Sequence, residues 1–262
     1  MNTKAINNRL TKTFKAGNKN LLNIYFTAGF PELDDTVKVL KALEKAGADM
    51  IEIGMPYSDP LADGPTIQAS SSKALSNGMS IKKLFEQLEG FRNEVSVPVI
   101  LMGYLNPVMQ YGVEAFCKKA AEVGIDGLIL PDLPINEYED SYRTIFEQHN
   151  LSNIFLVTPQ TSEERLRKID CISDGFIYAV STDSTTGGSK SIMDAKPYFE
   201  RLKATNLKNP LMIGFNIKDH STFSFACQYA SGGIIGSAFI KALEKSTNLE
   251  KDVFDFVKMV KG

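Results

Sequence analysis

Short runs of apolar, β-branched residues alternate with longer amphipathic segments along the whole chain. The short runs predict strands near 22–26, 49–53, 97–102, 126–130, 153–157, 175–180, 210–213 and 232–236. The longer segments, such as DDTVKVLKALEKAG and VEAFCKKAAEVG, have the apolar spacing of helices that bury one face. Gly47 and Gly124 follow these two segments, where a glycine in the left-handed conformation commonly ends a helix.

Eight strand–helix units in succession predict an α/β fold with parallel strands. A single (β/α)8 TIM barrel over residues 1–262 fits the number of units and the length, with an extra N-terminal helix in TKAINNRLTKTFKAG. A doubly wound sheet is the alternative, although it would usually show a glycine fingerprint or a second domain. No linker, low-complexity tract or shift in composition divides the sequence.

The two longest intervals between strand starts run from 49 to 97 and from 175 to 210. Extra length in a barrel lies in the loops after the strands, at the end where barrel enzymes have their active sites. The first interval contains MPYSDPLADGPTI directly after its strand, and the second contains STDSTTGGSKS, which is small, polar and glycine-bearing like a mobile lid. We therefore expect functional residues in both loops.

Glu52 is the first candidate for chemistry. Alternation along DMIEIG puts Ile51 and Ile53 on one face of the strand and Met50 and Glu52 on the other. If the β-branched pair packs on the outer helices, Glu52 points into the barrel at its C-terminal mouth. An unpaired carboxylate there has a raised pKa and can act as a general acid or base near neutral pH. The alternative is a structural ion pair with a lysine or arginine across the barrel.

Asp59 and Asp63 lie in the strings SDP and ADGP, which are good turn sequences. The local pattern alone favours a turn role over a catalytic role for each of them. Three prolines in the same loop stiffen its backbone, as a preorganised site requires.

Gly236 and Ser237 follow the last predicted strand and begin a helix. In many barrels this position holds a phosphate, because the first backbone N–H groups of the helix are free to bind an anion. A glycine–serine helix cap with no ligand explains the pattern equally well.

Composition excludes several classes of protein. The net charge of −2 gives no electrostatic basis for binding nucleic acid or an anionic membrane. Three widely spaced cysteines predict reduced thiols in a cytoplasmic protein, and we expect neither a signal peptide nor a membrane-spanning helix. With only two histidines, a His-rich metal site and a Ser-His-Asp triad are not expected. Dinucleotide and Walker A motifs do not occur.

The stretch IEIGMPYSDPLADGPTIQ closely resembles the signature of the tryptophan synthase α subunit, E-L-G-x-P-F-S-D-P-x-A-D-G-P. FTAGFP, GYLNPV, DGLILPDLP, GFIYAVS and IGSAFI also fall in the order of that family, so the similarity covers essentially the whole chain. The resemblance implies a (β/α)8 barrel that cleaves indole-3-glycerol phosphate to indole and glyceraldehyde 3-phosphate. This retro-aldol lyase reaction needs no cofactor or metal in this subunit.

The resemblance also implies roles for individual residues. Glu52 and Asp63 fall on the two catalytic carboxylates, and Asp59 falls on a position tied to the partner interface. The positions that contact the substrate are Tyr25 facing the indole ring, Tyr178 in the pocket beside Glu52, Thr186 on the lid, and Gly187, Phe215, Asn216, Gly236 and Ser237 around the phosphate.

The implied partner is a pyridoxal phosphate-dependent β subunit, in an αββα assembly through which indole passes internally. SDPLADGP, GYLNPV and PDLP correspond to the loops that face it. Two positions depart from the family pattern: Ser184 opens STTG in place of G-V-T-G, and Asn216 changes G-F-G-I to GFNI. Asparagine tolerates the left-handed conformation better than most residues, so it is a plausible replacement for this glycine.

Two other functions stay open on the residues alone. A phosphosugar aldolase or isomerase on the same barrel would need a Schiff-base lysine or a metal cluster, and no predicted strand ends in lysine. A degenerate α subunit that only activates its β partner would agree with the two departures. Release of indole from indole-3-glycerol phosphate, with and without a β subunit, separates the three.

Overall fold

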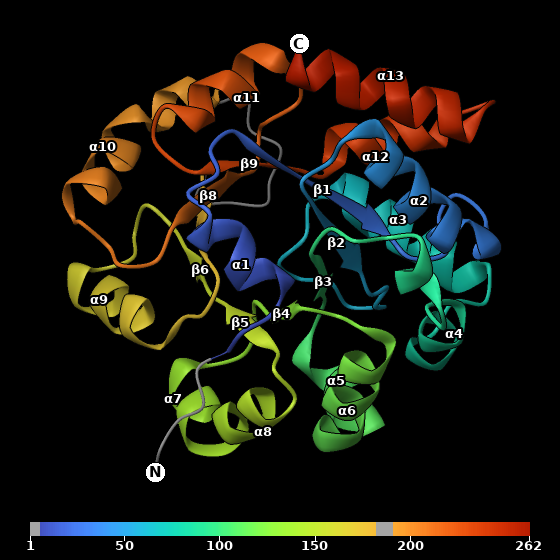
Figure 1. Ribbon diagram of the computed structural model, residues 1–262, viewed down its shortest axis with the longest axis horizontal. Helices are drawn as coiled ribbons and strands as arrows, with labels where there is room; N and C mark the ends of the chain where they lie inside the picture. The colour runs from blue at the N-terminus through green and yellow to red at the C-terminus, as the bar shows by residue number, and fades with distance from the viewer. Residues whose placement is uncertain (1–5, 182–190) are drawn as a thin grey trace.

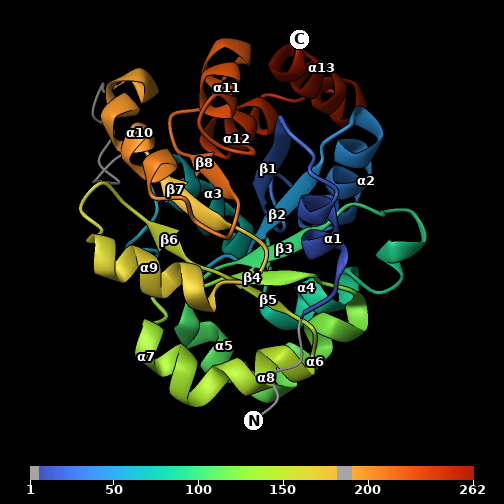
Figure 2. The same cartoon turned by 60° about the vertical axis from the view of Figure 1, so that its left-hand side comes forward.

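The computed structural model describes residues 6–181 and 191–262. Within them the strands form one parallel sheet that curls into a barrel, with helices around it (Figures 1 and 2). The strands are β1 (Leu21–Thr27), β2 (Met50–Gly54), β3 (Val99–Met102), β4 (Gly127–Ile129), β5 (Ser152–Ile154), β6 (Leu156–Val157), β7 (Ile177–Val180), β8 (Leu211–Gly214) and β9 (Gly232–Ile235). The predicted (β/α)8 barrel is confirmed.

The helices connect successive strands, and most of them lie on the outside of the barrel (Figure 1). They are α1 (Arg9–Lys15), α2 (Thr36–Ala46), α3 (Pro65–Ser76), α4 (Ile81–Gln87), α5 (Leu105–Tyr111), α6 (Val113–Val123), α7 (Ile135–Glu137), α8 (Arg143–Gln148), α9 (Glu163–Ile172), α10 (Lys196–Ala204), α11 (His220–Cys227), α12 (Ser237–Glu244) and α13 (Leu249–Lys261). Gly47 and Gly124 close α2 and α6 with φ of 93° and 99°, as predicted.

The barrel departs from the expected eight strands because the fifth is interrupted by one residue. The predicted fifth strand is divided by Phe155 into β5, which pairs with β4, and β6, which pairs with β7. The N–H of Tyr178 donates to the carbonyl of Phe155 at 3.0 Å, so the barrel closes through this residue. Strand propensity does not reveal the break, because the run NIFLV is apolar on both sides of it.

The alternation predicted for β2 is confirmed. Ile51 and Ile53 belong to the large apolar cluster between the sheet and the outer helices. Met50 belongs to a second cluster inside the barrel, which includes Ile100, Ile234 and other strand residues. Because successive side chains on a strand point to opposite faces, Glu52 lies on the inner face with Met50.

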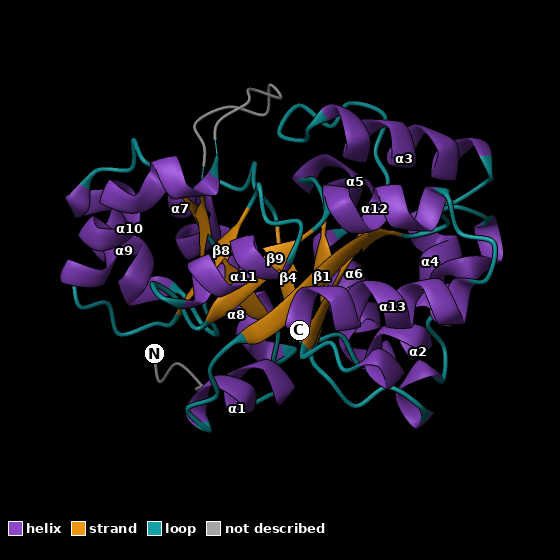
Figure 3. Cartoon of the chain, turned by 90° about the horizontal axis from the view of Figure 1, so that it is seen from above, coloured by secondary structure: helices purple, strands orange, loops and turns teal. Residues whose placement is uncertain are grey.

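The extra N-terminal helix is present but begins later than predicted. Asn8 caps it: the Asn8 side chain accepts the Thr11 N–H at 3.0 Å, so α1 starts at Arg9. Leu10 packs into the inner cluster. Asn8 donates to the Asp126 carbonyl at 2.7 Å, just before β4. The helix therefore covers the N-terminal end of the strands (Figure 3), which leaves the C-terminal end for a site.

Asp126 organises that covered end. Its carboxylate, almost fully buried, accepts hydrogen bonds from the Arg92 guanidinium at 2.5 Å, the Val99 N–H at 3.0 Å and the Arg9 N–H at 3.2 Å. One buried charge thus joins α1, β3 and the start of β4, with donors on both carboxylate oxygens.

We predict that Asp126→Ala lowers the free energy of unfolding by about 3–5 kcal/mol, because it leaves the half-buried Arg92 charge without its partner. Urea denaturation of the isolated chain measures this. The matched control is Asp255→Ala, which breaks an exposed pair with Lys251 on α13 and should change stability little. Equal effects of the two substitutions would contradict the role given to Asp126.

Candidate functional site

Glu52 lies inside the barrel and is completely buried. Its Oε1 accepts a hydrogen bond from the Asn23 amide at 2.6 Å, and its Oε2 has no partner within residues 6–181 and 191–262. Burial raises the pKa of Glu52 to about 8, and the Asn23 hydrogen bond opposes that rise. Among the described side chains no lysine or arginine pairs with it, so the ion-pair alternative is not supported.

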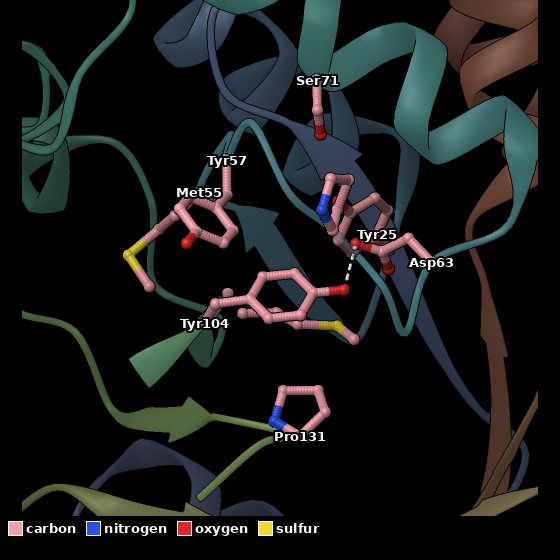
Figure 4. Close-up of a pocket in the computed structure, with 10 residues that line it drawn as sticks. Tyr25, Met55, Tyr57, Asp63, Ser71, Tyr104 and Pro131 are labelled. Carbon is pink, nitrogen blue, oxygen red and sulfur yellow. Dashed lines mark hydrogen bonds between the residues drawn. The ribbon is translucent and has the colours of Figure 1, made fainter. Parts of the chain in front are cut away.

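Asp63 lies at the edge of the same end of the barrel, in the loop between β2 and α3. The Tyr104 hydroxyl donates to its carboxylate at 3.0 Å and accepts the Ala62 N–H at 2.8 Å (Figure 4). Burial raises the pKa of Asp63 to about 6, and the Tyr104 hydrogen bond limits the rise. The two carboxyl groups therefore titrate on opposite sides of pH 7.

The loop that carries Asp63 is built from turns, as its sequence suggests. The Leu61 N–H donates to the Asp59 carbonyl at 2.9 Å, and the Asp63 N–H donates to the Pro60 carbonyl at 3.0 Å. The Asp59 side chain is exposed and bonds only its neighbour Ser58 among the described residues. Asp63 thus takes part in a turn through its backbone and presents its carboxylate to a cavity, whereas Asp59 faces solvent.

That cavity lies between the loops after β2 and β3, against β1 (Figure 4). The residues that line it are Tyr25, Met55, Tyr57, Pro60, Asp63, Ser71, Met102, Gly103, Tyr104 and Pro131. Most of the lining is aromatic or apolar, and among residues 6–181 and 191–262 Asp63 is its one carboxylate. The lining therefore offers an aromatic and apolar surface with a carboxylate acceptor at its edge.

Tyr25 and Tyr178 are both buried, and each lies against a glycine of the neighbouring strand. A Cβ on Gly54 would meet the Tyr25 hydroxyl at 2.0 Å, and a Cβ on Gly214 would meet that of Tyr178 at 2.3 Å. Burial raises the pKa of both hydroxyls, and the charges of Asp63 and Glu52 raise both further. Both tyrosines are therefore neutral hydroxyls close to the two carboxyl groups.

The last two strands carry the predicted anion-binding residues. Phe215 and Asn216 follow β8 with φ of 67° and 58°, which is unusual for residues other than glycine. Ser181 donates to the Phe215 carbonyl at 2.9 Å and helps to hold this conformation. The Phe215 ring also contacts Tyr178, with centroids 6.4 Å apart.

Gly236 precedes α12 and has no side chain to cap it, and no other side chain in the described part of the chain caps this helix. The first N–H groups of α12 therefore keep their capacity to bind an anion, because such groups have no acceptor within the helix. Gly214 of β8 is paired with Ile234 of β9, so the two loops leave the barrel side by side. The helix start predicted at Ser237 is confirmed.

Comparisons with known proteins agree with this arrangement. The family model described as tryptophan synthase alpha chain matches residues 11–261. The tryptophan synthase alpha chain of Christiangramia forsetii is 56% identical over 97% of this chain and 99% of its own length. The chain belongs to the tryptophan synthase alpha chain family.

Solved structures support the same assignment. The alpha subunit from Legionella pneumophila str. Paris superposes with a TM-score of 0.87 at 35% identity, over 97% of both chains. A chain of Mycobacterium tuberculosis tryptophan synthase gives 0.85 at 33%, over 96% of this chain and 95% of its own. The activity of the chain is cleavage of indole-3-glycerol phosphate, a carbon–carbon lyase reaction.

The geometry brings together most of the site residues expected of a tryptophan synthase alpha chain. Glu52, Asp63, Tyr25, Tyr178 and Phe215 lie at one end of the barrel, near Asn216, Gly236 and Ser237. Thr186 and Gly187, and the Ser184 departure beside them, lie outside the described residues.

Two residues in contact with the carboxyl groups escaped the sequence reasoning. Asn23 bonds Glu52, and Tyr104 bonds Asp63. Asn23 interrupts an otherwise apolar strand, which is a signal of the same kind as Glu52 itself. Tyr104 falls in GYLNPV, which the resemblance assigns to the loops that face the partner. The motif therefore gave no reason to expect the hydrogen bond from Tyr104 to Asp63.

Residues 6–181 and 191–262 contain neither a candidate metal centre nor a candidate membrane span. No group of three or more histidine, cysteine, aspartate or glutamate side chains there could hold a metal ion. Among the helices within those ranges, none has both the length and the apolar character needed to cross a membrane.

We predict that Tyr104→Phe raises the pKa of Asp63 by about 1 unit, because it removes a hydrogen bond to the charged form. The acid limb of the pH–rate profile for indole release should move to higher pH by that amount. The matched control is Tyr57→Phe. The Tyr57 ring packs on Tyr104, and its hydroxyl accepts a hydrogen bond from Asn106, so the control also removes one hydroxyl from this cluster. An acid limb that stays in place in Tyr104→Phe would show that this bond does not tune Asp63.

Proposed function

We propose that the chain cleaves indole-3-glycerol phosphate with Glu52 as the group that exchanges protons and Asp63 as the anion that stabilises the indole nitrogen. The observation that carries this proposal is the environment of Glu52. A carboxyl group that is completely buried, is bonded to the Asn23 amide and has a pKa of about 8 is mostly protonated at neutral pH and can still release its proton.

The reaction needs two proton transfers at the bond that breaks. Glu52 as the acid gives its proton to indole C3, and the positive charge that results is shared with the ring nitrogen. Glu52 as a carboxylate then takes the proton of the side-chain hydroxyl next to C3. The carbon–carbon bond breaks, its electron pair returns to the ring, and indole and the aldehyde of glyceraldehyde 3-phosphate form. Glu52 ends protonated, as it began.

Asp63 suits the second role because it is the more acidic of the two. With a pKa of about 6 it is mostly ionised at neutral pH, and it lies in the aromatic cavity with Tyr25 and Tyr104. A carboxylate there accepts the indole N–H, whose acidity increases when C3 is protonated. The attraction is therefore greater in the transition state than in the bound substrate, which is the condition for catalysis.

The phosphate end of the substrate is proposed to lie at the loops after β8 and β9. Support comes from the uncapped start of α12 at Gly236 and Ser237 and from the left-handed backbone at Phe215 and Asn216. The Asn216 position takes φ of 58°, so the residue that replaces the family's glycine keeps a glycine-like backbone. Gly187 and Thr186 are proposed to complete this end and the lid.

The β subunit is proposed to dock on the loops after β2, β3 and β4, in an αββα assembly that passes indole internally. Asn106 donates to the Tyr57 hydroxyl at 3.0 Å, and the Leu105 N–H donates to Asp132 at 2.9 Å, so the three loops are joined. Leu61 is 88% exposed at the tip of the first loop. The Tyr104 bond connects this surface to Asp63. A cytoplasmic location is part of the same proposal.

We predict that Glu52→Gln lowers the rate of indole release by about 10²–10⁴ while the fold is kept, because the general acid–base group is lost. Asp63→Asn should lower it by about 10²–10³, because an anion that faces the developing charge is lost. Asp59→Asn is the matched control, because it neutralises another aspartate in the loop that carries Asp63. It should keep most of the activity of the isolated chain. Indole release from indole-3-glycerol phosphate, with circular dichroism to check folding, measures all three.

The same assay with a β subunit tests the partner. Wild-type turnover should rise by about 5–150-fold at saturating substrate, the usual range for coupling between sites. A Glu52→Gln variant within fivefold of wild type would reject Glu52 as the proton carrier. A wild-type chain that stimulates the β subunit but releases no indole would identify a degenerate activator instead.

We predict that Ser237→Asp raises KM for the substrate much more than it lowers kcat, because a carboxylate at the start of α12 repels the phosphate. Ser72→Asp adds the same charge at an exposed position of α3 and is the matched control. Steady-state kinetics at two ionic strengths measures the effect, which should weaken at high salt. A KM equal to that of the control would place the phosphate elsewhere.

A further inference from the structure

Asn23 lies in a position where an amide is costly. It is completely buried on β1, and its register neighbours Met50 and Ile234 both belong to the apolar cluster inside the barrel. Its Nδ2 donates to Glu52, whereas its Oδ1 has no partner within the described residues. A buried amide with one polar atom unsatisfied destabilises a fold, so this bond to Glu52 needs a functional explanation.

The bond distinguishes the two oxygens of Glu52. Oε1 receives an N–H from Asn23 at 2.6 Å, and an amide nitrogen can only donate. A proton on Oε1 would face that donor directly, so Oε1 is disfavoured as its site. Oε2 has no partner in the described residues. While the Asn23 bond persists, the acid form of Glu52 carries its proton on Oε2.

From this geometry we propose that Asn23 is a positioning residue for the lyase reaction: it holds Oε1 of Glu52 as a permanent acceptor, so that Oε2 alone gives and takes the proton. The inference rests on the proposed role of Glu52. The two proton sites of the substrate flank one carbon–carbon bond, so a single fixed oxygen can serve both in turn. A carboxyl group free to rotate would lose that alignment, which commonly costs about 10²-fold in rate.

The other ionisable groups near Glu52 are Tyr25 from β1, Tyr178 from β7 and Asp63 from the loop after β2. Both tyrosines stay neutral, because burial raises the pKa of each. Asp63 is unchanged in an Asn23 variant. A change in the titration of Glu52 in such a variant can therefore be assigned to the loss of the Asn23 bond.

The test uses Asn23→Leu, which keeps the approximate shape and removes both polar atoms, and Asn23→Asp, which keeps the shape and removes the donor. Asn153→Leu is the matched control, because Asn153 is also a buried strand asparagine but shares its face with Leu128 toward the outer helices. The first readouts are kcat and KM for indole release. The second is the pKa of Glu52, obtained from the pH dependence of its ¹³C carboxyl signal, which is assigned by its absence in Glu52→Gln.

We expect Asn23→Leu to lower kcat by about 10–100-fold with little change in KM, since the defect lies in proton transfer. The pKa of Glu52 should rise by about 1 unit, because a hydrogen bond to the charged form is lost. In infrared spectra of the acid form, the C=O stretch of Glu52 should move to higher frequency when its N–H donor is gone. In Asn23→Asp the two carboxyl groups should share one proton and titrate in two steps. The control should show none of these changes, whatever its stability.

An unchanged Glu52 pKa together with unchanged kcat in Asn23→Asp, or in a folded Asn23→Leu, would overturn the inference. An infrared signature of a free C=O in the wild-type acid form would overturn it too, since it would mean that the amide turns and leaves the proton on Oε1. Failure of the proposed function is distinguishable, because it appears as an active Glu52→Gln. The spectroscopic titration reports on the Asn23 bond in either case.

Discussion

The whole site depends on one constraint, the burial of the Glu52 carboxyl group inside a closed parallel barrel. Burial raises its pKa from 4.5 to about 8. The folded chain therefore binds more protons than the unfolded chain between those values, and stability from this group falls as pH rises through that window. Below pH 4.5 this contribution is fully present, and above pH 8 it is lost. At neutral pH this group therefore makes folding less favourable than it is in acid, and the barrel tolerates that cost.

The surroundings of that carboxyl group depend on two strand positions that have no side chain. Gly54 and Gly214 each leave room for a tyrosine from the neighbouring strand, and an added Cβ at either would overlap the ring. Tyr25 and Tyr178 are therefore buried close to Glu52, which is itself fully buried. They have polar tips but remain neutral, so they keep the surroundings apolar enough to hold its pKa high without pairing with it.

Sequence reasoning was accurate where a periodic rule applies. Alternation along β2 put Glu52 on the inner face, and Gly47 and Gly124 marked the ends of α2 and α6. It was less accurate where the outcome depends on a partner distant in sequence. The break at Phe155 depends on which neighbouring strand each half pairs with. The contacts of Asn23 and Tyr104 join residues 29 and 41 positions apart, which no local pattern encodes.

The division of labour between the two carboxyl groups follows from the depth at which each is held. Glu52 is inside the barrel and accepts a hydrogen bond from the Asn23 amide. Asp63 is at the edge of the barrel, half-buried, and accepts one from the Tyr104 hydroxyl, which itself accepts a backbone N–H. Both pKa values rise through burial, but the deeper group rises to about 8 and the shallower one only to about 6. At pH 7 one group is therefore mostly an acid and the other mostly an anion. Two residues of almost the same chemistry thereby acquire the two different charges that the proposed reaction requires.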